Sequence, residues 1–153
     1  GRDEQAIDYL IERSVLDKAH IVGQDEKESG IRALLNLGHS FGHALESETA
    51  YARFLHGEAV AIGMVTAAKL SEDRGLCEPG TAESLTALLK KFDLPVHIPG
   101  DLSVERLAAA LKLDKKAVAS GLRLVLLKAI GEAVVDQGST AEQILNAIKE
   151  SQG

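Results

Sequence analysis

The chain has few of the residues that mark several large classes of protein. It has one cysteine, Cys77, so no disulfide can form within it. No apolar run approaches the roughly 20 residues that a membrane-spanning helix needs. Acidic residues outnumber lysine and arginine, 23 to 17, which gives a formal net charge of −6 and argues against nucleic acid or an anionic membrane as the main partner. With no signal peptide visible, we expect a cytoplasmic protein.

The composition is that of a globular protein. Hydrophobic residues make up 45% and charged residues 26% of 153 residues, which is enough for one domain with a core, spanning residues 1–153. The first residues, Gly1 to Glu4, run almost directly into a helical pattern, which suggests a piece of a longer chain. No glycine-rich strand-to-helix turn of the dinucleotide kind occurs, so we expect no nucleotide-binding domain within this sequence.

The hydrophobic pattern predicts a mainly α fold, a helical bundle with one small β-hairpin. Helices are expected over 4–19, 31–50, 57–73, 81–92, 103–111 and 140–149. The first should bury the face that carries Ile7, Leu10, Ile11, Val15 and Leu16, and the third is apolar nearly all round, which predicts a buried central helix. Expected N-caps are Thr81, Ser103 and Thr140, the last in a capping box with Gln143, and Gly75 should end the third helix. The hairpin is expected over 122–127 and 132–135, around Gly131.

The segment 31–50 carries polar residues that are unusual on a helix. Arg32, Asn36, His39 and His43 are spaced by 4, 3 and 4 residues, which places all four on a single face of the expected helix. A plain solvated face would more often carry Glu, Lys and Gln. Gly38 and Gly42, four apart, weaken the helix but permit the close approach of another backbone or a ligand. This departure from helix-building rules is typical of a functional site.

Two readings of these histidines stay open at this point. A histidine on a helix is most often structural or exposed, whereas a pair four residues apart, with an arginine, an asparagine and two glycines, favours a metal or active site. A zinc-peptidase motif is excluded, because Ser40 follows His39 where that motif requires Glu. His56 follows 13 residues after His43, and a short turn could fold it back beside the pair, although it could equally be a helix-start residue. Neutral imidazoles suit Zn²⁺ or similar ions.

Two long motifs resemble the 3-dehydroquinate synthase family. They are Arg32-Ala-Leu-Leu-Asn-Leu-Gly-His-Ser-Phe-Gly-His-Ala-Leu-Glu46 and Leu55-His-Gly-Glu-Ala-Val-Ala-Ile-Gly-Met64. Lys18, the segments Asp25–Gly30 and Asp114–Lys116, and Gly121–Leu127 match the family as well. The resemblance covers essentially the whole chain. It implies the C-terminal, helical half of a two-domain enzyme whose active site lies in the cleft between this half and an N-terminal NAD-binding domain.

The resemblance also implies roles for individual residues. His39 and His56 would bind Zn²⁺ or Co²⁺, while His43 would lie near the substrate as a proton-transfer group rather than on the metal. Arg32, Asn36 and Lys18 would hold anionic and hydroxyl groups of the substrate, with Lys116 a further candidate. Glu28 matches an acidic position that would pair with these cations. The family's third metal ligand is a glutamate that would precede residue 1, and the NAD site would also lie outside this chain.

The implied reaction converts 3-deoxy-D-arabino-heptulosonate 7-phosphate to 3-dehydroquinate and phosphate, a step toward the aromatic amino acids, with NAD and a divalent metal as cofactors. Without a hydride carrier, the chain alone is predicted to be inactive and to bind metal weakly. The family commonly forms homodimers.

Two alternative functions remain: the same half of a related sugar-phosphate cyclase such as 2-deoxy-scyllo-inosose synthase, or a non-catalytic helical module. His20 and His97 lie outside both long motifs, so we assign them no functional role.

Overall fold

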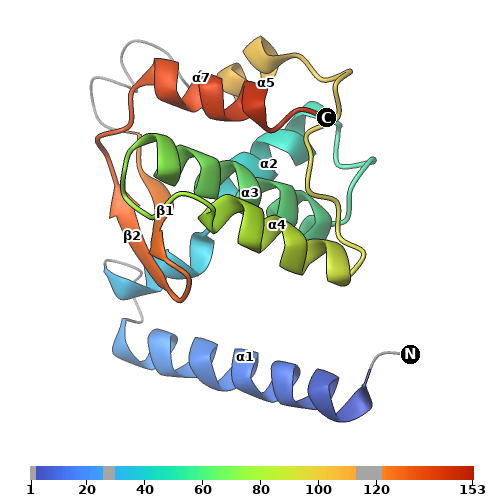
Figure 1. Cartoon of the computed structure of the whole chain (residues 1–153), viewed down its shortest axis with the longest axis vertical. Coiled ribbons are helices and arrows are strands. Elements are labelled where there is room, and N and C mark those ends of the chain that lie inside the picture. The colour runs from blue at the N-terminus through green and yellow to red at the C-terminus, as the bar shows by residue number, and fades with distance from the viewer. Residues whose placement is uncertain (1–2, 26–29, 113–121) are drawn as a thin grey trace. The chain divides into compact units, whose positions relative to one another are not determined.

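The computed structural model describes residues 3–25, 30–112 and 122–153. The chain divides into two compact units, Gly1–Leu35 and Asn36–Gly153, and each is described by itself. In the described residues the fold is mainly helical with one two-stranded antiparallel hairpin, as the sequence predicted (Figure 1).

The first unit contains the long helix α1 (Glu4–Gln24). Asp3 caps it, because its carboxylate accepts hydrogen bonds from the backbone N–H groups of Gln5 and Ala6. The expected burial of one apolar face is wrong within this unit: no residue of α1 is buried, and the side chains of Leu10, Ile11, Val15 and Leu16 are exposed. Among the described residues of this unit, 3–25 and 30–35, there is no second long helix against which this stripe could pack.

The predicted helix over 31–50 is not continuous. A 3₁₀ helix, η1 (Ile31–Asn36), is followed by a turn at Leu37 and Gly38, and the α-helix α2 (His39–Glu48) starts only there. Gly38 has a left-handed backbone with φ of 79°, and a Cβ at this position would lie 2.6 Å from the backbone nitrogen of Met64. The contact with the next helix therefore forces a conformation in which the helix cannot continue. Arg32 and Asn36 belong to η1, and His39 and His43 belong to α2.

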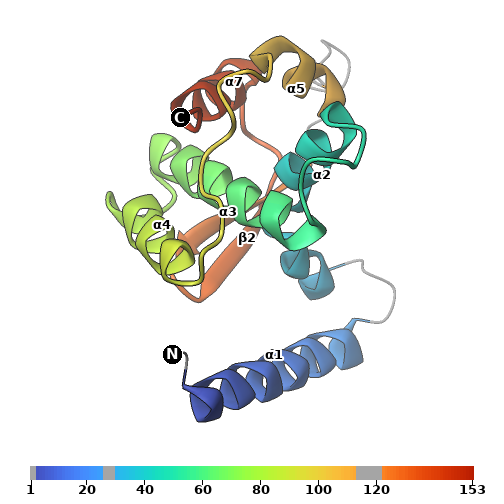
Figure 2. The ribbon, with the colours of Figure 1, turned by 90° about the vertical axis from the view of Figure 1, so that its right-hand side faces the viewer.

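Helix α3 (His56–Asp73) is the buried centre of the second unit, as predicted. It contacts α2, α4 (Thr81–Lys91), α7 (Ala141–Glu150) and the hairpin, which surround it in two perpendicular views (Figures 1 and 2). Ten of its 18 residues are buried, among them Ile62, Thr66 and Leu70. Gly75, with φ of 63°, follows its end as expected.

The remaining helix starts follow the predicted capping signals with one exception. Ser103 caps α5 (Val104–Ala110), and Thr140 forms a capping box with Gln143 at the start of α7, as predicted. Thr81 is not an N-cap: Gly80 occupies that position with φ of 91°. Thr81 is the first helical residue, and its hydroxyl donates a hydrogen bond to the carbonyl of Glu78.

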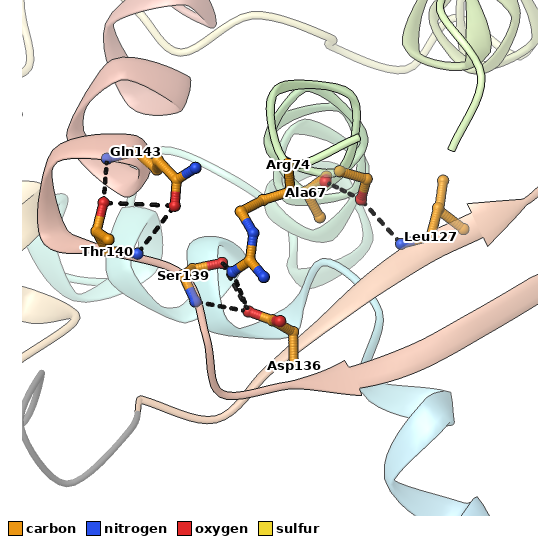
Figure 3. Close-up of polar contacts among 8 residues, drawn as sticks. Ala67, Arg74, Leu127, Asp136, Ser139, Thr140 and Gln143 are labelled. Carbon is orange, nitrogen blue, oxygen red and sulfur yellow. Dashed lines mark hydrogen bonds and ion pairs between the residues drawn. The ribbon is translucent and has the colours of Figure 1, made fainter. Parts of the chain in front are cut away.

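The hairpin consists of β1 (Leu124–Ala129) and β2 (Glu132–Asp136), with a register irregularity between Leu127 and Ala129. It is fixed to α3 by polar contacts that Figure 3 shows in part. The buried Ser71 hydroxyl accepts from the Leu127 backbone N–H at 2.9 Å, and Arg74 contacts Asp136 and the Ser139 hydroxyl. Among the described helices, none combines the length and apolarity needed to cross a membrane.

Candidate metal centre

Glycines bring helices α2 and α3 into backbone contact. A Cβ on Gly63 would lie 2.1 Å from the carbonyl oxygen of Gly38, and one on Gly42 would lie 3.2 Å from backbone atoms of Ala59 and Val60. Gly38 thus lies opposite residues 60–64 and Gly42 opposite 59–60, so the two helices run antiparallel. The sequence predicted a close approach at Gly38 and Gly42, and the structure confirms it.

Three imidazole rings lie close together where α2 and α3 meet. His39 begins α2, His43 follows one turn later, and His56 begins α3. The ring centroids are 5.7 Å apart for His39 and His43, 5.3 Å for His39 and His56, and 5.8 Å for His43 and His56. The rings therefore form a nearly equilateral cluster, and the expectation that His56 folds back beside the histidine pair is confirmed.

The connection from α2 to α3 is a tight turn with two left-handed residues. Ala50 and Tyr51 have φ of 52° and 58°, and the Tyr51 backbone N–H donates to the Glu46 carbonyl at 2.7 Å. At the start of α3, the Glu58 carboxylate accepts from the Leu55 backbone N–H at 2.8 Å. These bonds fix where α3 begins, and hence where the His56 side chain leaves the backbone.

Glu46 is a fourth member of this cluster that sequence reasoning left without a role. It is 7% exposed, and its Oε1 lies 3.0 Å from His56 Nδ1. One ligand atom from each of His43, Glu46 and His56 falls within 4.8 Å of the others. The available signal was spacing: His43 follows His39 by four residues and Glu46 follows His43 by three, which places all three on one side of α2.

The donor set fits a borderline divalent ion. His39 Nδ1 lies 3.3 Å from the Leu37 carbonyl oxygen, and His56 Nδ1 contacts the Glu46 carboxylate. With Nδ1 of both rings facing an oxygen acceptor, Nε2 of both rings keeps its lone pair for a ligand role. Imidazole nitrogens with a carboxylate are ligands of Zn²⁺ and Co²⁺. His43 and His56 are exposed, so the cluster is accessible from solvent.

The other predicted site residues are divided between the two units or lie outside the described residues. Asn36 is the first residue of the second unit, whereas Lys18, on α1, and Arg32, on η1, belong to the first. The backbone N–H of Arg32 donates to Asp25 Oδ2 at 3.2 Å. Glu28 and Lys116 lie outside the described residues. The structure thus brings together His39, His43 and His56 and adds Glu46.

Solved structures of sugar-phosphate cyclases share this fold. The chain matches 2-epi-5-epi-valiolone synthase from Streptomyces hygroscopicus subsp. jinggangensis 5008, solved with NAD⁺ and Zn²⁺ bound, at 27% identity and a TM-score of 0.77 over 93% of this chain and 39% of that one. Two structures of 2-deoxy-scyllo-inosose synthase match at 22% identity over 98% of this chain and 42% of theirs. One, with carbaglucose-6-phosphate, NAD⁺ and Co²⁺, has a TM-score of 0.77, and the other 0.79. The chain therefore spans about two fifths of the length of these enzymes.

The sequence also matches a protein-family model, described as 3-dehydroquinate synthase C-terminal, over residues 1–117. That span includes the whole histidine cluster and both long motifs. The resemblance inferred from those motifs is thereby confirmed at the level of the family. This chain belongs to the 3-dehydroquinate synthase C-terminal family.

Proposed function

We propose that this chain is the metal- and substrate-binding domain of a 3-dehydroquinate synthase. The complete enzyme would convert 3-deoxy-D-arabino-heptulosonate 7-phosphate to 3-dehydroquinate and phosphate. The observation that carries the proposal is the cluster of three imidazoles, 5.3–5.8 Å apart on the facing helices α2 and α3, within a chain of this family. A structural role for the rings alone is disfavoured because His43 and His56 are exposed and stabilise no core.

We assign His39 and His56 as ligands of Zn²⁺ or Co²⁺, through the Nε2 atoms that their Nδ1 contacts leave available. A divalent ion, when bound, supplies Lewis acidity toward substrate hydroxyl oxygens. His43, one helical turn from His39, is assigned to proton transfer, because an imidazole exchanges protons near neutral pH.

Cationic and amide side chains would bind the anionic and hydroxyl groups of a sugar phosphate. Arg32 can grip a carboxylate or phosphate through two parallel N–H bonds, whereas Lys18 adds a point charge. Asn36 offers both a donor and an acceptor to a hydroxyl. Glu28 and Lys116 keep the roles that the family resemblance implies, as an acidic partner of these cations and a further substrate contact.

The hydride chemistry would come from NAD, bound to an N-terminal domain outside these residues. The sequence has no dinucleotide fingerprint, and the solved relatives with NAD⁺ are more than twice as long as this chain. We therefore expect no turnover from residues 1–153 alone. Purified chain incubated with substrate, NAD⁺ and Zn²⁺ should release no phosphate, whereas sustained phosphate release would show that the domain assignment is wrong.

The ligand assignment is tested by metal titration. Zn²⁺ binding, followed by calorimetry or by competition with a chromophoric chelator, should be lost in His39→Ala and in His56→Ala but kept in His43→Ala. His20→Ala, an exposed histidine on α1, is the matched control and should bind as the parent chain does. Equal loss in all three cluster variants would make His43 a ligand and contradict its assignment to proton transfer.

A second candidate is the same domain of a related sugar-phosphate cyclase. The fold match to 2-epi-5-epi-valiolone synthase, at 27% identity, favours keeping it. Both candidates use the same histidine cluster, so metal binding does not separate them. The full-length protein should therefore be assayed with 3-deoxy-D-arabino-heptulosonate 7-phosphate and with glucose 6-phosphate, the sugar phosphate that corresponds to the carbaglucose-6-phosphate bound to the solved 2-deoxy-scyllo-inosose synthase. Turnover of the first alone supports 3-dehydroquinate synthase, and turnover of the second refutes that finer assignment.

A further inference from the structure

We propose that Glu46 is a positioning residue that orients the His56 imidazole, so that Nε2 of this ring faces the metal. The proposal rests on the proposed function, because it concerns the same metal site. Its basis is one contact: Oε1 of the buried Glu46 lies 3.0 Å from His56 Nδ1.

The two partners differ sharply in exposure. The Glu46 side chain is 9% exposed, whereas that of His56 is 57% exposed. An imidazole so exposed lies beside the rings of His39 and His43 but is not fixed in one rotamer by core packing. A carboxylate buried beneath it supplies the fixed point that the ring otherwise lacks. The buried Glu46 carboxylate therefore fixes the orientation of the His56 ring, and not the reverse.

Hydrogen-bond chemistry then sets the tautomer. An ionised carboxylate only accepts hydrogen bonds, so Nδ1 of the neutral ring must carry the proton and donate it. Nε2 is left with the lone pair that a metal ligand needs. Carboxylates that hold metal-bound histidines in this way also make the ring a stronger ligand. His39 has the same arrangement in weaker form, with Nδ1 3.3 Å from the Leu37 carbonyl oxygen.

The backbone around Glu46 is anchored by core packing and by hydrogen bonds. It lies near the end of α2, directly after Ala44 and Leu45, which are buried in the core. Its carbonyl oxygen accepts from the Tyr51 N–H at 2.7 Å, at the turn that leads toward α3. One residue thus contacts the turn through its main chain and the His56 ring through its side chain.

The competing reading makes Glu46 a direct ligand, because its carboxylate shares the 4.8 Å cluster with His43 and His56. Exposure favours the positioning role. His56 and His43 open to solvent, where a substrate reaches an ion, and the Glu46 carboxylate lies buried. An ion held directly by Glu46 would be drawn toward the interior and away from that open side.

The first experiment needs no metal. Nitrogen-15 NMR of the imidazoles, at about pH 8 where histidine is mostly neutral, reports which ring nitrogen carries the proton. His56 should be the Nδ1–H tautomer in the parent chain and move toward Nε2–H in Glu46→Leu. Glu46→Gln, whose amide oxygen still accepts, should largely restore Nδ1–H. Glu48→Gln is the matched control, because Glu48 is a second carboxylate of α2 with a side chain only 11% exposed, and it pairs with Arg106 rather than with a histidine. An Nε2–H ring in the parent chain, or no change in Glu46→Leu, would overturn the proposal.

The second experiment measures the metal. Zn²⁺ affinity should fall about 10- to 100-fold in Glu46→Leu, by less in Glu46→Gln, and not at all in Glu48→Gln. The visible spectrum of bound Co²⁺ should keep its band positions in Glu46→Gln, because the ligand set is unchanged. Shifted bands would make Glu46 a ligand and refute the positioning role. If the parent chain binds no metal, the proposed function fails, but the tautomer result still decides whether Glu46 orients His56.

Discussion

Replacing Gly63 with alanine should destabilise the chain, although alanine is the better helix former. In the middle of a helix, Gly→Ala normally gains about 1 kcal/mol. At Gly63 the new Cβ would lie 2.1 Å from the Gly38 carbonyl oxygen and 2.9 Å from the Gly42 nitrogen, whereas ordinary contact begins at 3.4 Å. All these atoms are main chain, so no side-chain rotation relieves the clash.

The size of the effect follows from these opposing terms. Overpacking a close-packed site costs about 1–3 kcal/mol and occasionally more, and a backbone clash falls at the upper end. After the gain in helix propensity, we expect Gly63→Ala to lower the free energy of unfolding by about 2 kcal/mol. With a urea m-value of about 1–3 kcal/mol/M, the unfolding midpoint should fall by about 1 M. The start of α2 must also move away from α3, so Zn²⁺ affinity should fall with it.

The matched control is Gly57→Ala in the same helix. Gly57 lies in the first turn of α3, and its Cβ position has nothing within 4 Å. The same substitution should therefore be neutral or stabilising by up to about 1 kcal/mol. The free energy of unfolding is measured by urea unfolding followed by circular dichroism. A decrease in Gly63→Ala together with no change or an increase in Gly57→Ala would support the close backbone contact between α2 and α3. A Gly63→Ala chain as stable as the parent would refute it.

Three further predictions concern the second unit. Ala50→Gly should raise the free energy of unfolding by roughly 0.5 kcal/mol, because glycine relieves a left-handed backbone, and urea unfolding measures this. Hydrogen bonding from Arg53 holds the pKa of the Asp101 carboxyl below its usual range, so Asp101→Asn should lower stability near pH 7, and the difference should vanish as the pH falls through that lowered pKa. Burial raises the pKa of the Cys77 thiol, so a disulfide reagent at neutral pH should react slowly with the folded chain and rapidly in urea. Equal stability curves for Asp101→Asn at all pH values, or rapid labelling of the folded chain, would contradict the last two.

Much of the second unit could be predicted from local signals. The apolar composition of 57–73 located α3, and the capping residues Ser103 and Thr140 marked the starts of α5 and α7 to within one residue. These signals are local, because a cap bonds to backbone groups only two or three positions away. The Thr81 prediction missed by one residue because Gly80, which tolerates a left-handed backbone, took the cap position.

The break at Gly38 could not be read from the sequence in the same way. A glycine within a helical pattern is usually tolerated, and its left-handed backbone here depends on Met64, 26 positions away. The role of Glu46 was hidden for a similar reason. A glutamate on a helix is most often solvated, and its burial appears only when α2 packs on α3. The three histidines were predictable as a group because their residue types are rare on an ordinary helix face.

The position of two histidines at helix starts has a consequence for solution conditions. His39 and His56 are each the first residue of their helix, where the unsatisfied backbone N–H groups carry partial positive charge. A bare divalent cation there meets an opposing field, which an anion from the buffer relieves. Apparent Zn²⁺ affinity should therefore be higher in phosphate or sulfate than in chloride, once chelation by the free anion is corrected for. Titrations of this domain are comparable only when the counter-ion is the same.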